Sequence, residues 1–262
     1  MVDKIIWQNV KSYDHKTIIQ RINFVEKNMN GLLPLYGQEC ESLKKYSKKH
    51  NLPPYEMICL RNTIKIQKEI NASKYFAQSI NKILKNFTNT DPNSLDIVSF
   101  LKSTKMPIGH VIKILKNKEL SKHNLDKITK IKKMIVLNEQ NIMHKSIEFE
   151  YMLENYLQNK NIKFQTETDI KKSGNYTVTP DILLDEPIII QVDGTDHIVK
   201  WMDAKNYIMV DVPFIMKSLN KQAKKYNDVF GMGAFVFHYG FDNSLHIPGT
   251  IILDGSVIEQ SL

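Results

Sequence analysis

Two short stretches of the sequence carry residue types that can bind a metal ion and activate water. Asp181 opens the apolar run 182–184, and Asp203 and Lys205 close the apolar run 198–202. Both runs have the composition of β-strands, and side chains two apart on a strand point to the same face. Two carboxylates that converge with a lysine suit a hard divalent cation, with the lysine left to polarise a water or a phosphate oxygen. A surface hairpin with scattered charges is the alternative, because acid-x-Lys pairs are common by chance.

Helices are predicted on both sides of these strands. Apolar residues at helical spacing indicate a helix over 147–157 and a second helix over 214–226. The acidic residues of the first helix are Glu148, Glu150 and Glu154. The second helix carries Gln222 four positions before Tyr226, so both side chains lie on one helix face. The expected order is therefore helix, strands, helix and a further strand over 233–239.

The order of these elements resembles the PD-(D/E)xK nuclease superfamily. Pro180-Asp181 matches the first half of its motif, and Asp203-Ala204-Lys205 matches the second half. The Gln222-x-x-x-Tyr226 spacing is similar to its auxiliary glutamine-tyrosine motif. Several short motifs recur in one order: Glu148-Phe149-Glu150, Thr179-Pro180-Asp181, 201–205, Gln222, 230–233 and 238–241. Together they resemble the family named for its Thr-Pro-Asp motif, whose best-known member is the codanin-interacting nuclease of animals.

The resemblance implies two domains and a metal-dependent nuclease activity. Residues 144–262 are expected to form a restriction-endonuclease-like α/β nuclease domain, a mixed sheet flanked by helices. Residues 1–143 are expected to form an all-α, basic, helix-turn-helix-like domain that binds nucleic acid. The expected reaction is hydrolysis of phosphodiester bonds, most plausibly in DNA. A catalytically inactive nucleic-acid-binding or scaffold protein that retains the nuclease fold is the alternative.

The resemblance also assigns roles to individual residues. Glu150, Asp181 and Asp203, with the carbonyl of Ala204, are expected to hold Mg²⁺ or Mn²⁺. Lys205 is expected to orient the attacking water or to stabilise the transition state as a point charge. Gln222 is expected to fix Lys205 or a nucleotide. The catalytic set is thus Asp181, Asp203, Lys205, Glu150 and Gln222.

Two of these assignments have rivals in the sequence. Glu148 is the fallback for Glu150, because residues two apart on a helix lie about 200° apart around its axis and only one can face the site. Asp193 is the rival for Asp203, since it stands in the turn before the second strand. We prefer Asp203 because Asp193 has no lysine two positions further on.

Charge is distributed unevenly along the chain. Residues 1–144 hold 25 Lys and Arg against 12 Asp and Glu, a net +13, whereas residues 145–262 hold 11 against 16, a net −5. The net charges of the two parts sum to the formal net charge of the chain, +8. The basic N-terminal part is suited to binding a polyanion, and the acidic C-terminal part is suited to binding cations. A solvated surface rich in lysine is the alternative.

The N-terminal half is predicted to be all helix, with two helix-turn-helix outlines. The first pairs helices over 40–50 and 55–70 around Pro53-Pro54. The second pairs helices over 94–101 and 110–116 around a turn at 105–109. These helices are expected to contact DNA, with a protein partner as the other use of the same surface.

Other features exclude several classes of protein. No run of about eighteen apolar residues occurs, so no membrane association is expected. The start lacks the apolar core of a signal peptide, and the two cysteines lack zinc-finger spacing, which favours an intracellular protein of the cytoplasm or nucleus that is not secreted. No phosphate-cradling glycine loop and no Gly-x-Ser-x-Gly motif are present, which argues against ATP use and serine nucleophiles.

Overall fold

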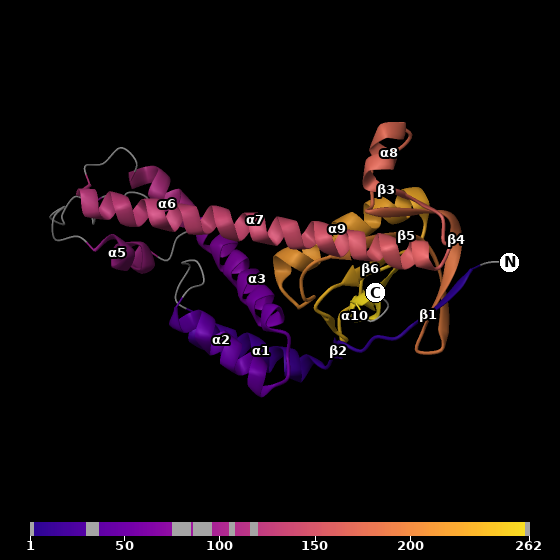
Figure 1. The fold of residues 1–262 in the computed structure, drawn as a ribbon, viewed down its shortest axis with the longest axis horizontal. Helices are drawn as coiled ribbons and strands as arrows, with labels where there is room; N and C mark the ends of the chain where they lie inside the picture. Colours follow the sequence, from indigo (N-terminus) through magenta and orange to yellow (C-terminus); the bar gives the residue numbers. More distant parts are fainter. Residues whose placement is uncertain are drawn as a thin grey trace. The chain divides into compact units, whose positions relative to one another are not determined.

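The computed structural model describes residues 3–29, 37–74, 85, 96–104, 108–115 and 120–259. Contacts divide the chain into two compact units. We call Met1–Arg21 together with Met143–Leu262 the sheet unit, and Ile22–Ile142 the helical unit. Figure 1 shows the elements of both units along the chain.

The sheet unit is built on one mixed sheet with strand order β1-β4-β5-β6-β8, and β3 pairs with β4 beside this path. Its strands are β1 Lys4–Trp7, β3 Phe164–Thr166, β4 Ile182–Val192, β5 Thr195–Lys205, β6 Gly233–Phe237 and β8 Thr250–Asp254. β4 runs antiparallel to β3 and β5, whereas the β1–β4, β5–β6 and β6–β8 pairs are parallel. A small second sheet pairs β2 Ser12–Tyr13 with β7 Phe241–Asp242.

A tight turn sets the register of the central hairpin. Asp193 and Gly194 connect β4 to β5, and both have positive φ, 48° and 79°. Two positive φ angles in a two-residue loop match the twist of an antiparallel pair, and Asp-Gly is a favoured sequence for such a loop. The turn therefore fixes which residues of β4 and β5 lie opposite each other at the far end of the hairpin.

Helices cover both faces of the sheet. The C-terminal half of α7 (Lys122–Asn159) passes across one face, where Phe149, Leu153 and Leu157 are fully buried (Figure 1). The other face packs on α9 (Pro213–Phe230) through Trp201, Phe235 and Phe237 among others. α8 (Glu167–Ser173) follows β3, and α10 (Ser256–Glu259) follows β8. A mixed α/β sheet flanked by helices is thus confirmed for this part of the chain.

Three features differ from the sequence prediction. The N-terminal half is not all helix, because Lys4–Trp7 forms β1 and pairs with β4 at the register Ile5↔Ile190. The predicted order ends with the strand over 233–239, whereas the structure has a further strand, β8, which follows it and pairs with β6. The helix predicted over 147–157 is the end of the 38-residue α7, whose sequence contains neither Pro nor Gly to stop it near residue 143.

The helical unit contains the end of α1 (His15–Asn28), α2 (Gln38–Lys49), α3 (Pro54–Ser73), α5 (Ile97–Thr104), α6 (Ile108–Leu115) and the first part of α7. α5, α6 and α7 share a core in which Leu101, Val111 and Ile128 are buried. α2 and α3 are linked by a buried ion pair, in which Arg61 Nε lies 2.6 Å from Glu39 Oε1. Pro54 stands at the start of α3, where its missing N–H costs no hydrogen bond.

The helices of both predicted helix-turn-helix outlines are present. α2 and α3 correspond to the first outline, and α5 and α6 to the second. In the second outline, residues 94–95, 105–107 and 116 lie outside the described residues, and so does most of its turn. DNA contact by these helices stays a prediction. None of the helices in the described ranges is long and apolar enough to cross a membrane.

Candidate functional site at the end of the sheet

Strand register brings three carboxylates together at one end of the sheet. Thr166 of β3 lies opposite Ile182 of β4, and Ile182 lies opposite Met202 of β5. The neighbouring residues at this edge are Glu167, Asp181 and Asp203. The structure therefore places the two predicted acids, Asp181 and Asp203, on adjacent strands, although they are 22 positions apart in the sequence.

Asp181 is held against β5 by a backbone hydrogen bond. The backbone N–H of Ala204 donates to its Oδ2 at 2.8 Å. Burial raises the pKa of Asp181 to about 8, and the negative charge of Asp203 acts in the same direction, against the lowering effects of Lys205 and the Ala204 hydrogen bond. Without a bound cation, this carboxyl group therefore keeps its proton to a higher pH than an ordinary aspartate does.

Asp203 is buried and carries two charged or polar partners. Lys205 Nζ forms an ion pair with its Oδ1, as the two-residue spacing on one strand face predicts. Gln222 Nε2 of α9 donates to its Oδ2 at 2.9 Å. The Asp203–Lys205 pair and Gln222 are thus brought together as predicted, and Gln222 binds the acid rather than the lysine.

A hydrogen-bond chain connects this acid to the Thr-Pro-Asp loop. Gln222 Nε2 also donates to the hydroxyl of Tyr226 at 2.9 Å, and that hydroxyl donates to the carbonyl of Thr179 at 3.0 Å. Burial, and then the charge of Asp203, raise the pKa of Tyr226. The tyrosine therefore stays protonated and fixes the loop that positions Asp181.

Glu150, and not Glu148, faces the two aspartates. Burial raises the pKa of Glu150, followed by the charge of Asp203 and that of Glu167. Glu148 is exposed and lies 3.2 Å from Nδ1 of His144, four positions earlier on α7. The preference for Glu150 over Glu148 thus agrees with the direction in which each side chain points.

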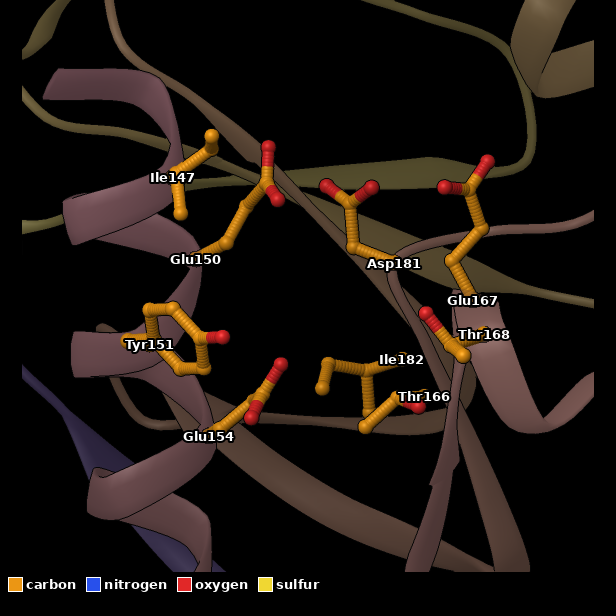
Figure 2. A pocket seen from close by; sticks show the side chains of 9 residues that line it. All are labelled: Ile147, Glu150, Tyr151, Glu154, Thr166, Glu167, Thr168, Asp181 and Ile182. Atoms are coloured by element: carbon orange, nitrogen blue, oxygen red, sulfur yellow. The ribbon is translucent and has the colours of Figure 1, made fainter. Parts of the chain in front are cut away.

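The acids border a cavity of about 200 Å³ between α7 and the ends of β3 and β4. It is lined by Ile147, Glu150, Tyr151, Glu154, Thr166, Glu167, Thr168, Asp181 and Ile182. Figure 2 shows the carboxylates of Glu150, Asp181 and Glu167 in a row along one side of it, with Glu154 pointing into it from α7. No lysine or arginine is among these lining residues, so the cavity has a strongly negative wall.

The chemistry of these side chains fits a hard divalent cation, which prefers carboxylate and carbonyl oxygens. Within the described ranges, no three or more His, Cys, Asp or Glu side chains lie close enough to form a ready-made metal-binding group. The predicted ligands Glu150, Asp181 and Asp203 are therefore neighbours, but in this structure their carboxylate groups do not converge on one metal position. The residue types fit, whereas their present spacing is looser than in a closed coordination shell.

The rival acid Asp193 lies far from this end of the sheet. Asp193 is in the turn at the opposite end of β5, about 33 Å from Asp203 at the usual rise per strand residue. His238 lies at the same end of the sheet as Lys205, to whose carbonyl its backbone N–H donates at 3.0 Å, and its ring is packed. It stacks on Phe149 with ring centroids 4.3 Å apart, and its two ring nitrogens lie 2.9 Å from Asn206 Oδ1 and 2.8 Å from Glu259 Oε1.

The sequence reasoning missed Glu167. Its backbone N–H donates to the carbonyl of Asp181 at 3.0 Å, and its Oε1 accepts from the Thr179 hydroxyl at 3.1 Å. Thr166 begins the helix that follows with a capping box, in which its hydroxyl accepts from the backbone N–H of Asp169. That cap, readable as Thr-x-x-Asp, is the one sequence signal that could have located the end of β3 and hence Glu167.

Comparison with known proteins gives the family. Residues 116–256 match the model of a family described as proteins of unknown function with the TPD sequence motif. The chain belongs to the TPD sequence-motif family. A protein of Acanthamoeba polyphaga mimivirus, described as uncharacterized, is 40% identical over 267 residues, which cover 98% of this chain and 97% of the viral protein. No solved structure matches the chain.

Proposed function

We propose that the protein is a metal-dependent nuclease of the PD-(D/E)xK type that hydrolyses phosphodiester bonds, most plausibly in DNA. The observation that carries this proposal is that Asp181 and Asp203 adjoin the paired residues Ile182 and Met202, with Lys205 paired to Asp203. A buried acid, a half-buried acid and a lysine at one end of a sheet are residue types that support metal-assisted hydrolysis. The restriction-endonuclease-like identity of the fold is part of the same proposal.

The residues have separate tasks in this reaction. Asp181, Asp203 and Glu150, with the carbonyl of Ala204, would hold Mg²⁺ or Mn²⁺. The ion, when bound, lowers the pKa of a water molecule and neutralises charge on the scissile phosphate. Binding requires Asp181 to lose the proton that burial and Asp203 retain on it.

Lys205 supplies the positive charge that comes from the protein itself. It follows Asp203 by two positions on β5, so its ammonium lies at the same edge as both acids. There it orients the attacking water and stabilises charge on the phosphate oxygens. The water gives up one proton as its oxygen bonds to phosphorus, the ester P–O bond breaks, and the leaving oxygen takes up one proton, so the proton count is unchanged.

Gln222 and Tyr226 act as positioning residues. Both belong to α9, and they connect Asp203 to the carbonyl of Thr179 through hydrogen bonds of 2.9 to 3.0 Å. This connection keeps the second acid and the Thr-Pro-Asp loop at a fixed separation. Loss of the Gln222 amide should therefore lower the rate by disordering Asp203 rather than by removing a charge.

The test is cleavage of labelled DNA by the purified protein in Mg²⁺, Mn²⁺ or EDTA. Single-stranded, duplex and branched DNA should be compared, each with wild type and with Asp203→Asn. Cleavage that needs the metal and Asp203 supports the proposal. Binding without cleavage on all substrates would instead support the catalytically inactive nucleic-acid-binding protein.

A further inference from the structure

A second cavity, of about 480 Å³, adjoins the acidic site on the side of α9. Ser218, Lys221 and Lys225 form part of one wall, and Thr177 stands on the loop that leads to the Thr-Pro-Asp motif. Glu167 lines both this cavity and the acidic one. The two cavities therefore meet at the carboxylate next to Asp181.

The α9 wall is a continuous stripe of one helix face. It begins at Ser218 and continues three, four and seven positions later with Lys221, Gln222 and Lys225. Residues at this spacing lie in one row along a helix. Gln222 is the member that reaches Asp203, at 2.9 Å. The row thus leads from solvent-exposed lysines directly to the buried acid.

The two cavities have opposite charge. The acidic cavity has four carboxylates in its lining and no lysine or arginine, whereas two lysines line the second cavity. Neighbouring Lys224 lies outside both linings and pairs with Asp228 at 2.7 Å. A polyanion is repelled by the first cavity until a cation is bound there, but the second attracts it directly.

The lysine spacing suits a nucleic-acid strand. Lys221 and Lys225, four residues apart on α9, are separated by about 6 Å along the helix axis. That rise is close to the separation of neighbouring phosphates in one strand. The hydroxyls of Ser218 and Thr177 add hydrogen-bond donors of the kind that contact phosphate oxygens.

We infer that this cavity holds the sugar-phosphate backbone of the substrate strand on one side of the scissile phosphate. Lys221 and Lys225 bind two consecutive phosphates of that strand, and Gln222 stands at the junction with the metal site. This inference rests on the proposed nuclease function. It names the substrate as one DNA strand that extends at least two phosphates beyond the bond to be cleaved.

The test measures binding without chemistry. Fluorescence anisotropy in EDTA would follow a labelled single-stranded DNA oligonucleotide over a range of salt concentrations. Lys221→Gln/Lys225→Gln is compared with Lys217→Gln/Lys224→Gln, which removes the same charge from the same helix outside the cavity. We expect the first variant to lower the log-log salt slope by about 1.4, or about 0.7 for each phosphate lost, and the control to leave it unchanged.

The outcomes separate this inference from the proposed function. An unchanged slope in the Lys221/Lys225 variant, or an equal fall in the control, overturns the inference even when wild type cleaves DNA. No binding by wild type also overturns it. If the slope falls as expected but the protein cleaves no DNA with any metal, the second cavity is supported as a binding site for a DNA strand. The proposed nuclease activity is then contradicted.

Discussion

The sheet unit and the helical unit both bury carboxylates, but they balance the charge differently. In the helical unit, Glu39 and Arg61 are both buried, and their Oε1 and Nε atoms lie 2.6 Å apart in a direct ion pair. At the sheet end, Asp181, Asp203 and Glu150 share the single ammonium of Lys205. A buried acid with a direct partner of opposite charge is typical of a structural ion pair, whereas several buried or half-buried acids around one lysine are typical of a site that binds a further cation.

The excess at the sheet end also shows in protonation. Burial raises the pKa of both Asp181 and Glu150, and the charge of Asp203 adds to both shifts. Asp181 thus loses its proton less readily than an ordinary aspartate unless a cation compensates its charge. Removing the charge of Asp181 should therefore stabilise the metal-free protein, whereas removing the charge of Glu39 should destabilise it.

The largest effect is expected on cleavage. Asp181→Asn and Lys205→Met should each lower the cleavage rate by about 10³-fold or more, because each removes a charge worth several kcal/mol in the transition state. Initial rates on labelled DNA at saturating Mg²⁺ measure this. Asp193→Asn makes the same chemical change in the turn at the other end of the hairpin and should leave the rate unchanged. Equal loss in both asparagine variants would remove Asp181 from the site.

The second effect is on the stability of the helical unit. Arg61→Met should lower the free energy of unfolding by about 3–5 kcal/mol, since it removes the guanidinium that lies 2.6 Å from the buried Glu39 carboxylate. Denaturant unfolding followed by circular dichroism measures the loss. The double variant Glu39→Gln/Arg61→Met should recover part of it. If the double variant were destabilised as much as Arg61→Met alone, the cost of Arg61→Met would not come from the loss of its ion pair with Glu39.

A smaller effect separates two glutamates on α7. Glu150→Gln should lower the cleavage rate by about 10²-fold, because it removes one of the three expected carboxylate ligands and leaves the other two. Glu148→Gln, two positions away, should change the rate by less than about twofold, since that side chain is exposed and pairs with His144. The rates should be measured over a range of Mg²⁺ concentrations. If Glu148→Gln needed more Mg²⁺ for half-maximal cleavage and Glu150→Gln did not, Glu148 rather than Glu150 would be the metal ligand on α7.

Part of the site was predictable from local rules. The two-residue period of a strand placed Lys205 beside Asp203, and the 3.6-residue period of a helix placed Gln222 and Tyr226 on one face. The choice of Glu150 over Glu148 followed from the resemblance to the nuclease superfamily and agrees with its position beside Asp181. Each of these relations lies within one element, so the sequence alone contains the geometry.

The parts that could not be predicted depend on pairing between distant segments. β1 is four residues long, and it is a strand because Ile5 lies opposite Ile190, which no local pattern near residue 5 records. Glu167 joins the site because the three residues of β3 pair with the start of β4. The 38-residue α7 was divided in the prediction because polarity near residue 140 suggested a boundary where the backbone continues as helix.

The last prediction concerns the stability of the metal-free protein as a function of pH. Burial raises the pKa of Asp181 to about 8, well above its value in an unfolded chain, so the folded state binds the proton more tightly. Stability is therefore favoured at low pH and falls as the pH rises from about 4 to about 8, where the buried carboxyl group must ionise. Asp181→Asn removes this cost and can still accept the Ala204 hydrogen bond.

In EDTA, Asp181→Asn should therefore unfold at the same temperature as wild type near pH 4. It should be more stable by about 1 kcal/mol or more at pH 8, which corresponds to a rise in Tm of about 2–4 °C. Thermal unfolding at a series of pH values measures the difference. Glu39→Gln is the matched control and should lower Tm, because its carboxylate is balanced by Arg61. If Asp181→Asn instead lowers Tm at pH 8, then Asp181 is a structural acid of the same kind as Glu39, and the contrast between the two regions fails.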